Sequence, residues 1–422
     1  MSFKLFLVCS FVLLGRPQDV LLFLQPFRPA LVVTALALGA MAFGTRRKEL
    51  SAALSTPDAK RYLLLYLIMI IGIPFAYHRR LAFDSVFQSY VVNMIFFVFL
   101  VSQVTTLDRL KSFVWVICIS TLMYSVFGGL LEMGGAGRFA VAGRVHDSND
   151  TAFLLVSLFP LCLYFIRFDE GRWKKIVAMG TSISAILIIL LTGSRGGFLA
   201  LGTVLAFLFL TKTSGFKSGH KMLLVVMLVM GVLWMWDKID IDRFLTLTDL
   251  SSDYNLSSQG GRLELWEGAI DLTLTNPATG VGVQCFPWAY FLARQNIGDT
   301  YLRWHTVHNA YLQIAVETGL IGFGVFMLIW LRSALTFLRV SKMQVRPETR
   351  QANELRACGG LMLISFAGLS VGAFFLSQAY SILFTLYFAL AAAINRIEAG
   401  LSTDIRRGSF EARVDASIKN GA

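Results

Sequence analysis

Long, continuously apolar runs dominate this chain, and short polar segments separate most of them. Several runs approach the roughly 20 residues that a helix needs to cross a bilayer. Because their apolar residues are continuous and do not alternate with polar ones, they predict helices and exclude a transmembrane β-barrel. Only 15% of the residues are charged, against about 25% in a typical soluble domain. We therefore predict an all-α, polytopic membrane protein.

The runs predict about twelve spans, with eleven or thirteen as alternatives. In chain order the predicted spans are 3–15, 20–44, 61–78, 85–105, 111–132, 151–167, 175–192, 196–211, 221–236, 308–331, 357–376 and 378–395. We expect the first to be a retained span and not a signal peptide. The second contains Pro26 and Pro29, which predict a broken or kinked start. A tight turn at Ser377-Gln378 is expected between the last two.

These spans divide the chain into four predicted parts. Residues 1–236 hold spans one to nine, and 237–307 form a large loop with amphipathic helices, one of which ends near Thr275. Residues 308–396 hold the last three spans. We expect 397–422 to be a polar tail that is disordered or a short helix.

Basic residues predict the orientation of the spans, because Lys and Arg favour cytoplasmic loops. With a cytoplasmic N-terminus, about two thirds of the 38 Lys and Arg residues fall on the cytoplasmic side. Both termini are therefore predicted to be cytoplasmic. The same distribution explains the net charge of +12 by topology, so we predict a bilayer environment and no nucleic-acid partner. The five cysteines suggest neither a disulfide nor a zinc site.

The remaining basic residues lie on the opposite side, which topology disfavours, and all but one are arginine. Arginine is preferred where a planar fork must hold a phosphate. The alternative is that these side chains reach lipid headgroups. The residues are Arg16, Arg28, Arg79, Arg80, Arg138, Arg144, Arg195, Lys238, Arg243, Arg262, Arg294 and Arg303.

His308 lies where a polar loop enters a predicted span, so it is a candidate general base. The partial positive charge of a helix N-terminus disfavours imidazolium, and a neutral imidazole accepts a proton. The alternative is a histidine that only caps the helix. Gln313 and Glu317 continue a polar stripe from Asn309 along the span. His305 lies one turn away, but no clear third ligand is present, so we predict no metal.

Two arginines are candidate phosphate ligands. Arg195 follows Gly193 and opens a predicted span, where glycine permits close approach and free N–H groups attract anions. A plain tight turn is the alternative. Arg262 follows two glycines and precedes an amphipathic helix; the alternative for it is a solvated loop arginine.

A polar segment before the span at 151 supplies further candidates. Arg138 and Arg144 are candidates for contact with a phosphate or a sugar. We expect Asp147 and Ser148 to cap the following helix in preference to binding a metal. The acidic residues form no catalytic pair elsewhere, which argues against a two-carboxylate glycosidase. The predicted orientation puts the Asp147 region on the same face as the candidate base and phosphate ligands.

Three patterns together resemble a known family. His308-Asn309, followed after nine residues by Gly319 and after two more by Gly322, resembles the spaced signature of O-antigen ligases. The runs 193–197 and 261–282 are similar to the wider O-antigen ligase and polymerase superfamily. The similarity covers about residues 190–325 by motif and the rest by layout. The signature is less specific between ligase and polymerase.

The resemblance implies a glycosyltransferase of the bacterial inner membrane with its site facing the periplasm. It would move a glycan en bloc from undecaprenyl pyrophosphate to a sugar of the lipid A core, with no metal or cofactor. The resemblance also implies that His308 activates the acceptor hydroxyl and that Arg195 and Arg262 hold the pyrophosphate. Further candidates for substrate binding are Arg138, Arg144, Arg303, His305 and Asn309.

Three alternatives remain open. One is a polymerase of O-antigen or exopolysaccharide, whose acceptor is a second lipid-linked glycan. Another is a protein O-oligosaccharyltransferase, whose acceptor is a Ser or Thr hydroxyl. The third is a transporter of lipid-linked sugar, which would show paired broken spans, and the sequence indicates no such pair.

Overall fold

The fold is known from a computed structural model that describes residues 2–43, 47–131, 147–169, 171–210, 261–296, 304–344 and 348–420, with single positions between 225 and 233. Within these residues every regular element is a helix. Eight of the helices are long and apolar enough to cross a membrane, and two shorter apolar helices accompany them. The chain is therefore a multi-pass helical membrane protein, as its apolar runs predict.

The N-terminal half contributes helices as far as residue 210. They are α1 (Ser2–Gly15), α2 (Pro17–Val20), η1 (Leu22–Phe27), α3 (Pro29–Phe43), α4 (Arg47–Leu54), α5 (Pro57–Gly72), η2 (Ile73–Phe75), α6 (Arg79–Asp84), η3 (Ser85–Tyr90), α7 (Val91–Gln103), α8 (Leu107–Leu131), α9 (Ser148–Phe168), α10 (Arg172–Leu191) and α11 (Arg195–Leu210). The C-terminal half contributes α15 (Arg262–Thr275), α16 (Phe286–Asn296), α17 (Ala310–Ser341), α18 (Arg350–Ala373) and α19 (Ile382–Asn420).

Eleven of the predicted spans coincide with helices, and the segment 221–236 lies outside the fully described residues. The predicted break near the start of the second span is confirmed. Pro26 lies inside the short 3₁₀ helix η1, and Pro29 is the first residue of α3. A proline is tolerated at the start of a helix because the first N–H groups have no partner within the helix.

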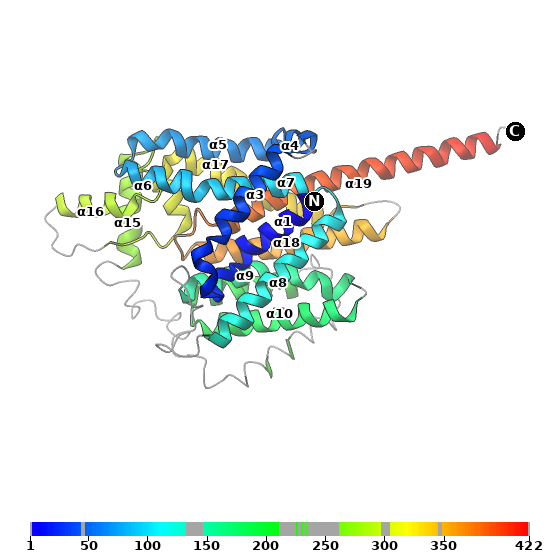
Figure 1. Ribbon diagram of the computed structural model, residues 1–422, viewed down its shortest axis with the longest axis horizontal. Coiled ribbons are helices and arrows are strands. Elements are labelled where there is room, and N and C mark those ends of the chain that lie inside the picture. Colours follow the sequence, from blue (N-terminus) through cyan, green and yellow to red (C-terminus); the bar gives the residue numbers. More distant parts are fainter. Residues whose placement is uncertain are drawn as a thin grey trace.

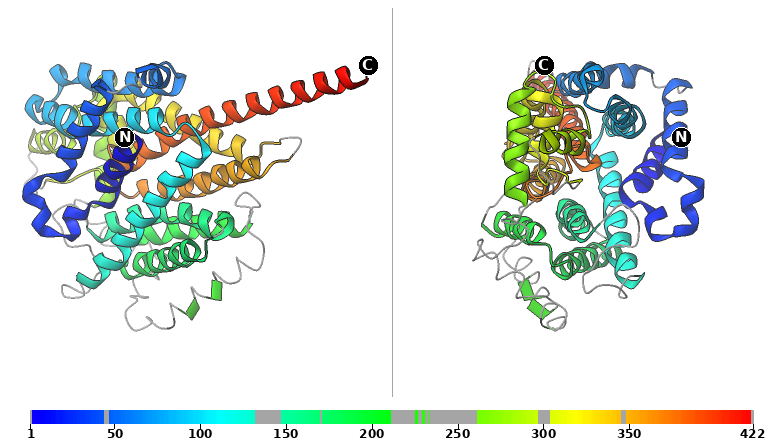
Figure 2. Two further views of the ribbon diagram at one scale, coloured as in Figure 1. Left: turned by 45° about the vertical axis from the view of Figure 1, so that its right-hand side comes forward. Right: turned by 90° about the vertical axis from the view of Figure 1, so that its left-hand side faces the viewer.

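Two details of the C-terminal spans differ from the prediction. The last two spans are joined not by a tight turn at Ser377-Gln378 but by residues 374–381, here called the α18–α19 connector. The predicted polar tail continues α19 as helix to Asn420, and Figures 1 and 2 show it projecting beyond the bundle. No proline interrupts residues 382–420, so local sequence does not stop the helix.

Helix α9 lies at the centre of one part of the bundle, between α8, α10, α11 and α18. Every residue from Thr151 to Phe165 is buried, as expected for a helix that is apolar on all sides. A second, smaller apolar cluster joins α15 and α16 to residues of the α5–α6 loop and α17. Figure 1 shows α15 and α16 at one end of the molecule, and the projecting end of α19 at the other.

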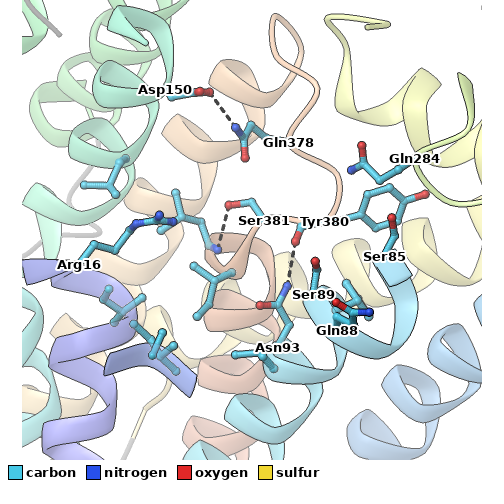
Figure 3. Close-up of a pocket in the computed structure, with 18 of the residues that line it drawn as sticks. Arg16, Ser85, Gln88, Ser89, Asn93, Asp150, Gln284, Gln378, Tyr380 and Ser381 are labelled. Atoms are coloured by element: carbon cyan, nitrogen blue, oxygen red, sulfur yellow. Dashed lines mark hydrogen bonds between the residues drawn. The ribbon is translucent and has the colours of Figure 1, made fainter. Parts of the chain in front are cut away.

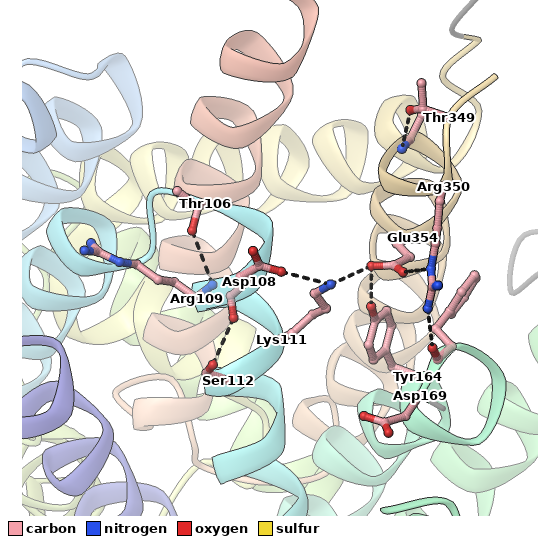
Figure 4. A network of polar contacts seen from close by, with 12 residues as sticks. Thr106, Asp108, Arg109, Lys111, Ser112, Tyr164, Asp169, Thr349, Arg350 and Glu354 are labelled. Carbon is pink, nitrogen blue, oxygen red and sulfur yellow. Dashed lines mark hydrogen bonds and ion pairs between the residues drawn. The ribbon is translucent and has the colours of Figure 1, made fainter. Parts of the chain in front are cut away.

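A buried ion network joins α8, α9 and α18 at the C-terminal end of α9 (Figure 4). Glu354 is only 3% exposed. Its carboxylate accepts from Lys111 Nζ at 2.8 Å, from Arg350 Nε at 2.9 Å and from the Tyr164 hydroxyl at 3.0 Å. Because the opposite end of α9 begins at Ser148, this network leaves the N-terminal end of α9 free for a different role.

Candidate active site

The α18–α19 connector ties together the N-terminal ends of two helices. The Ser377 hydroxyl accepts from the backbone N–H of His308 at 2.7 Å. Gln378 Nε2 donates to Asp150 Oδ1 at 2.7 Å, which links the connector to α9. The backbone N–H of Ala379 donates to Gln313 Oε1 at 3.1 Å, which links it to α17. The polar stripe of α17 therefore faces the protein interior, as expected for polar groups inside a membrane span.

His308 is held in a strained backbone conformation immediately before α17. Its φ is +52°, a value that costs a residue other than glycine about 1–3 kcal/mol. Neighbours on both sides hold it there: Ser377 accepts its N–H, and the preceding Val307 carbonyl accepts from Trp266 Nε1 at 3.0 Å. Its ring Nε2 lies 3.4 Å from the Thr306 hydroxyl. Such overdetermined strain is typical of functional sites.

The helix cap of α17 is Asn309, and not His308. The Asn309 side-chain oxygen accepts from the backbone N–H groups of Tyr311 and Leu312 at 2.9 and 3.1 Å. The helix begins at Ala310. His308 is therefore not required as the cap, which removes the main structural explanation for a histidine at this position. The expected substrate contact of Asn309 stays a prediction.

The surroundings of His308 favour its neutral form. Burial lowers its pKa below the ordinary value of 6.5, and the charges of Arg262 and His305 lower it further. The Asp147 carboxylate opposes them. A neutral imidazole near pH 7 has the protonation state that a general base requires. The same interactions place Arg262, His305 and Asp147 around His308, although the sequence assigned Asp147 only to capping.

Asp147 also fulfils the predicted cap of α9. Its Oδ1 accepts from the backbone N–H groups of Asn149 and Asp150 at 2.8 and 2.9 Å. This confirms the prediction for Asp147, since a short acidic side chain satisfies the first N–H groups of a helix; Ser148, predicted to cap as well, is instead the first residue of α9. The cap fixes the carboxylate at the face where His308 lies.

Arg262 opens α15 and reaches the site because α15 packs against the connector. The helix follows Gly261, which provides no side-chain cap. One turn later, the Trp266 ring packs edge-on against Phe374, with centroids 5.3 Å apart. Trp266 therefore binds both the connector and the residue before His308, and it sets the position of Arg262.

Arg195 opens α11 beside the same connector. Gly193 has φ +58°, which glycine adopts without strain, and the Ser194 hydroxyl accepts from the Gly197 N–H at 3.1 Å. A Cβ at Gly196 would lie 2.9 Å from Phe375, so the start of α11 contacts the connector closely. Arg195 and His308 therefore both adjoin the connector within residues 375–377. The N-termini of α11, α15 and α17 converge there, and such ends attract anions.

The signature glycine Gly319 interrupts α17, which the sequence predicted as one continuous span. Its φ of +69° and ψ of +179° are not helical. Residues 277–282, here called the clamp loop, satisfy the groups that the break exposes. Val281 N–H donates to Val316 O at 2.8 Å, and Leu320 N–H donates to Pro277 O at 2.8 Å. Non-helical backbone at membrane depth is tolerated where protein buries and bonds it.

Gly319 of the spaced signature and Gly280 of the 261–282 run therefore lie on opposite sides of one contact. A Cβ at Gly319 would lie 2.7 Å from the Ala278 carbonyl group, and one at Gly280 would lie 2.5 Å from the backbone of Glu317. Only glycine permits this approach of two backbones. The contact anchors the short first half of α17, which begins at Ala310, two residues after His308.

Glu317, whose role the sequence left open, binds the segment that follows the clamp loop. Its carboxylate accepts from the Gln284 backbone N–H at 2.8 Å, and its residue is only 2% exposed. Burial raises the pKa of the neighbouring Tyr380 well above its ordinary value, and the Glu317 charge adds to the effect. Glu317 therefore connects the segment after the clamp loop to the connector.

The other predicted site residues have different outcomes. Arg138, Arg144 and Arg303 lie outside the described residues. His305 is near enough to influence the pKa of His308. Among the described residues, no three His, Cys, Asp or Glu side chains are grouped to hold a metal ion. The sequence missed the site residues of the connector because a few polar residues between two apolar runs resemble an ordinary turn.

The comparison with known families finds a match in the region that contains this geometry. Residues 180–327 match the family model described as O-antigen ligase. The match covers about a third of the chain and includes α11, α15, the clamp loop and the break in α17. No curated protein matches the chain.

Over these residues the chain is similar to the O-antigen ligase family. The eight candidate spans indicate a multi-pass membrane protein.

Proposed function

We propose that this protein is an O-antigen ligase-like glycosyltransferase of the bacterial inner membrane. It transfers a glycan en bloc from undecaprenyl pyrophosphate to a sugar hydroxyl of the lipid A core, at the periplasmic face. The observation that carries the proposal is the position of His308, which is held within electrostatic reach of Arg262 at a convergence of helix N-termini. The family match over residues 180–327 supports the same class of reaction.

His308 acts as the general base. It removes the proton of the acceptor hydroxyl as that oxygen attacks the anomeric carbon of the donor glycan. The bond between that carbon and the pyrophosphate oxygen breaks, and its electron pair leaves with the pyrophosphate. Because the acceptor attacks opposite the leaving group, the anomeric configuration inverts.

Arg195 and Arg262 bind the pyrophosphate and stabilise its charge as it leaves. Arginine presents several N–H donors in a planar fork that matches phosphate oxygens. The helix N-termini from which both residues project add partial positive charge. A preorganised group of this kind is often the largest contribution to catalysis, and truncating one donor costs about 3 kcal/mol in comparable sites.

The acceptor distinguishes the proposed ligase from its alternatives. Purified protein in lipid is supplied with the lipid-linked glycan and, separately, with lipid A core, with more of the lipid-linked glycan, or with a Ser- or Thr-containing peptide. The proposal expects one glycan-modified lipid A core product and release of undecaprenyl pyrophosphate. A ladder of longer lipid-linked glycans would indicate a polymerase, and a modified peptide an oligosaccharyltransferase. Movement of the intact donor across the bilayer, without bond cleavage, would indicate a transporter.

The base is tested by replacing one histidine and comparing it with another. His308→Ala is expected to abolish transfer while the unfolding midpoint stays close to that of the wild type. His78→Asn is the matched control, because His78 Nδ1 accepts from the Leu81 N–H as the cap of α6, and Asn preserves a cap there. Full transfer by His308→Ala would exclude this residue as the base.

A further inference from the structure

A cavity of about 730 Å³ lies directly behind the connector (Figure 3). Its walls come from the ends of α1 and α9, from α2, η3 and α7, and from the connector. Gln378, which bonds Asp150, belongs to its wall and directly follows Ser377, the partner of His308. The volume falls in the range of roughly 300–1,000 Å³ that is usual for small-molecule sites.

Unusual backbone conformations gather around this cavity. The helix that begins at Arg79 changes to a π-helix at Ser85–Tyr90, and that turn contributes Ser85, Gln88 and Ser89 to the wall. Such turns are rare and are frequently found at functional sites. Arg16 and Gln284 also line the cavity, with φ of +46° and +60°. Strain of this kind persists where the surrounding structure maintains it for function.

The polar part of the wall is rich in hydroxyl and amide groups. The buried Gln18 Oε1 makes no hydrogen bond to the described residues. Ser85 and Ser89 offer hydroxyls. Unbonded buried polar atoms require an explanation, and a ligand that supplies hydrogen-bonding groups is one. Phe153 and several aliphatic residues form an apolar part of the same wall.

The charges of the cavity differ from those around His308. Among the described residues, the cavity wall contains one cation and one anion, Arg16 and Asp150, which lie within electrostatic reach of each other. The corner around His308 instead has Arg262 and His305 close by, with Arg195 on the adjoining helix. The cationic surroundings of His308 suit a diphosphate. The cavity, whose two charges offset each other, suits a neutral ligand with many hydroxyl groups.

We propose that this cavity is the saccharide-binding subsite. It holds sugar residues through Gln18, Ser85 and Ser89, while the diphosphate lies at Arg195 and Arg262. This inference rests on the proposed glycan transfer, and it specifies which part of the protein binds the sugar. The donor glycan and the acceptor core share this chemistry, and the kinetic experiment distinguishes them.

Two substitutions test the subsite. Ser89→Trp fills the cavity from the π-helix, and Gln18→Leu removes the unbonded carbonyl. Phe87→Trp is the matched control on the same π-helix, since Phe87 is 38% exposed and does not line the cavity. We measure the KM for the donor glycan, the KM for the acceptor, and inhibition by undecaprenyl pyrophosphate that carries no sugar.

Ser89→Trp should raise one saccharide KM at least tenfold. Gln18→Leu should raise it roughly three- to tenfold, as for one or two lost hydrogen bonds. The substrate whose KM changes is the one bound in the cavity. Phe87→Trp should change neither KM, and inhibition by the sugar-free lipid should be equal in all variants.

Two results would overturn the inference while transfer itself persists. One is unchanged saccharide KM values in both cavity variants. The other is weaker inhibition by the sugar-free lipid, which would assign the cavity to the lipid chain.

If the wild type transfers no glycan to any acceptor, the proposed function fails separately. Direct binding then decides the subsite, with a soluble oligosaccharide released from the donor or from the core as the probe. Binding to the wild type and its loss in Ser89→Trp would support the subsite. Equal binding to both proteins, or no binding to either, would refute it.

Discussion

Gly319→Ala is the change that most directly tests how the first half of α17 is held. Gly319 has φ +69° and ψ +179°, a region that essentially only glycine occupies. An alanine Cβ there would lie 2.7 Å from the Pro277 carbonyl oxygen and from the Ala278 carbonyl group. The obstacle is backbone, so the variant must move the clamp loop or refold the break.

The size of the effect follows from these contacts. The backbone strain alone costs about 1–3 kcal/mol. Moving Pro277 breaks its bond with Leu320, and a larger shift also breaks the bonds from Val281 to Val316 and from Gly282 to Glu317. Each bond contributes about 0.5–1.5 kcal/mol. We therefore expect a loss of about 2–6 kcal/mol, a large part of the roughly 5–15 kcal/mol that stabilises a typical protein.

The measurement is denaturant unfolding in detergent, followed by circular dichroism, together with the glycan-transfer rate. Gly324→Ala is the matched control on the same helix, because a Cβ there meets nothing within 4 Å and its φ is not positive. The control should gain about 0.5–1 kcal/mol, as usual for glycine to alanine in a helix. Equal stability of the Gly319 and Gly324 variants would refute the clamp.

The other predictions concern charge. Arg262→Gln removes a cation that lowers the His308 pKa, so the acidic limb of kcat/KM should move to higher pH; Asp147→Asn removes an anion that raises it, so the limb should move to lower pH. Shifts in the same direction would contradict the assigned environment. Arg195→Ala should reduce kcat/KM by roughly a hundredfold, the effect of about 3 kcal/mol, and an unchanged value would remove Arg195 from the site. Glu354→Gln should lower stability by about 1–3 kcal/mol, after allowance for solvent at its partners, and leave the donor KM unchanged. A raised donor KM with normal stability would place Glu354 in the site.

The helical architecture could be predicted from sequence because it depends on local properties. An apolar run of sufficient length forms a helix in lipid whatever surrounds it, since its backbone must bond internally. Pro26, Pro29 and Asp147 acted as predicted for the same reason, because a proline or a cap acts within one turn of the helix.

The break at Gly319 could not be predicted in the same way. Glycine is tolerated within membrane helices, and the partner that stabilises the break lies about 40 residues earlier in the clamp loop. The connector was missed for a related reason, since Ser377 and Gln378 gain their roles only through residues distant in the chain.

The sequence alone determined that this chain spans a membrane as helices, and it indicated His308, Arg195 and Arg262 through spaced motifs. Only the tertiary structure decided that Arg262 and Asp147 act on His308, and that the connector and a cavity lie beside it. The physical reason is the separation along the chain over which each interaction acts. Hydrophobicity and capping act between neighbours in sequence, whereas the protonation of His308 and the shape of the cavity depend on segments that only folding brings together.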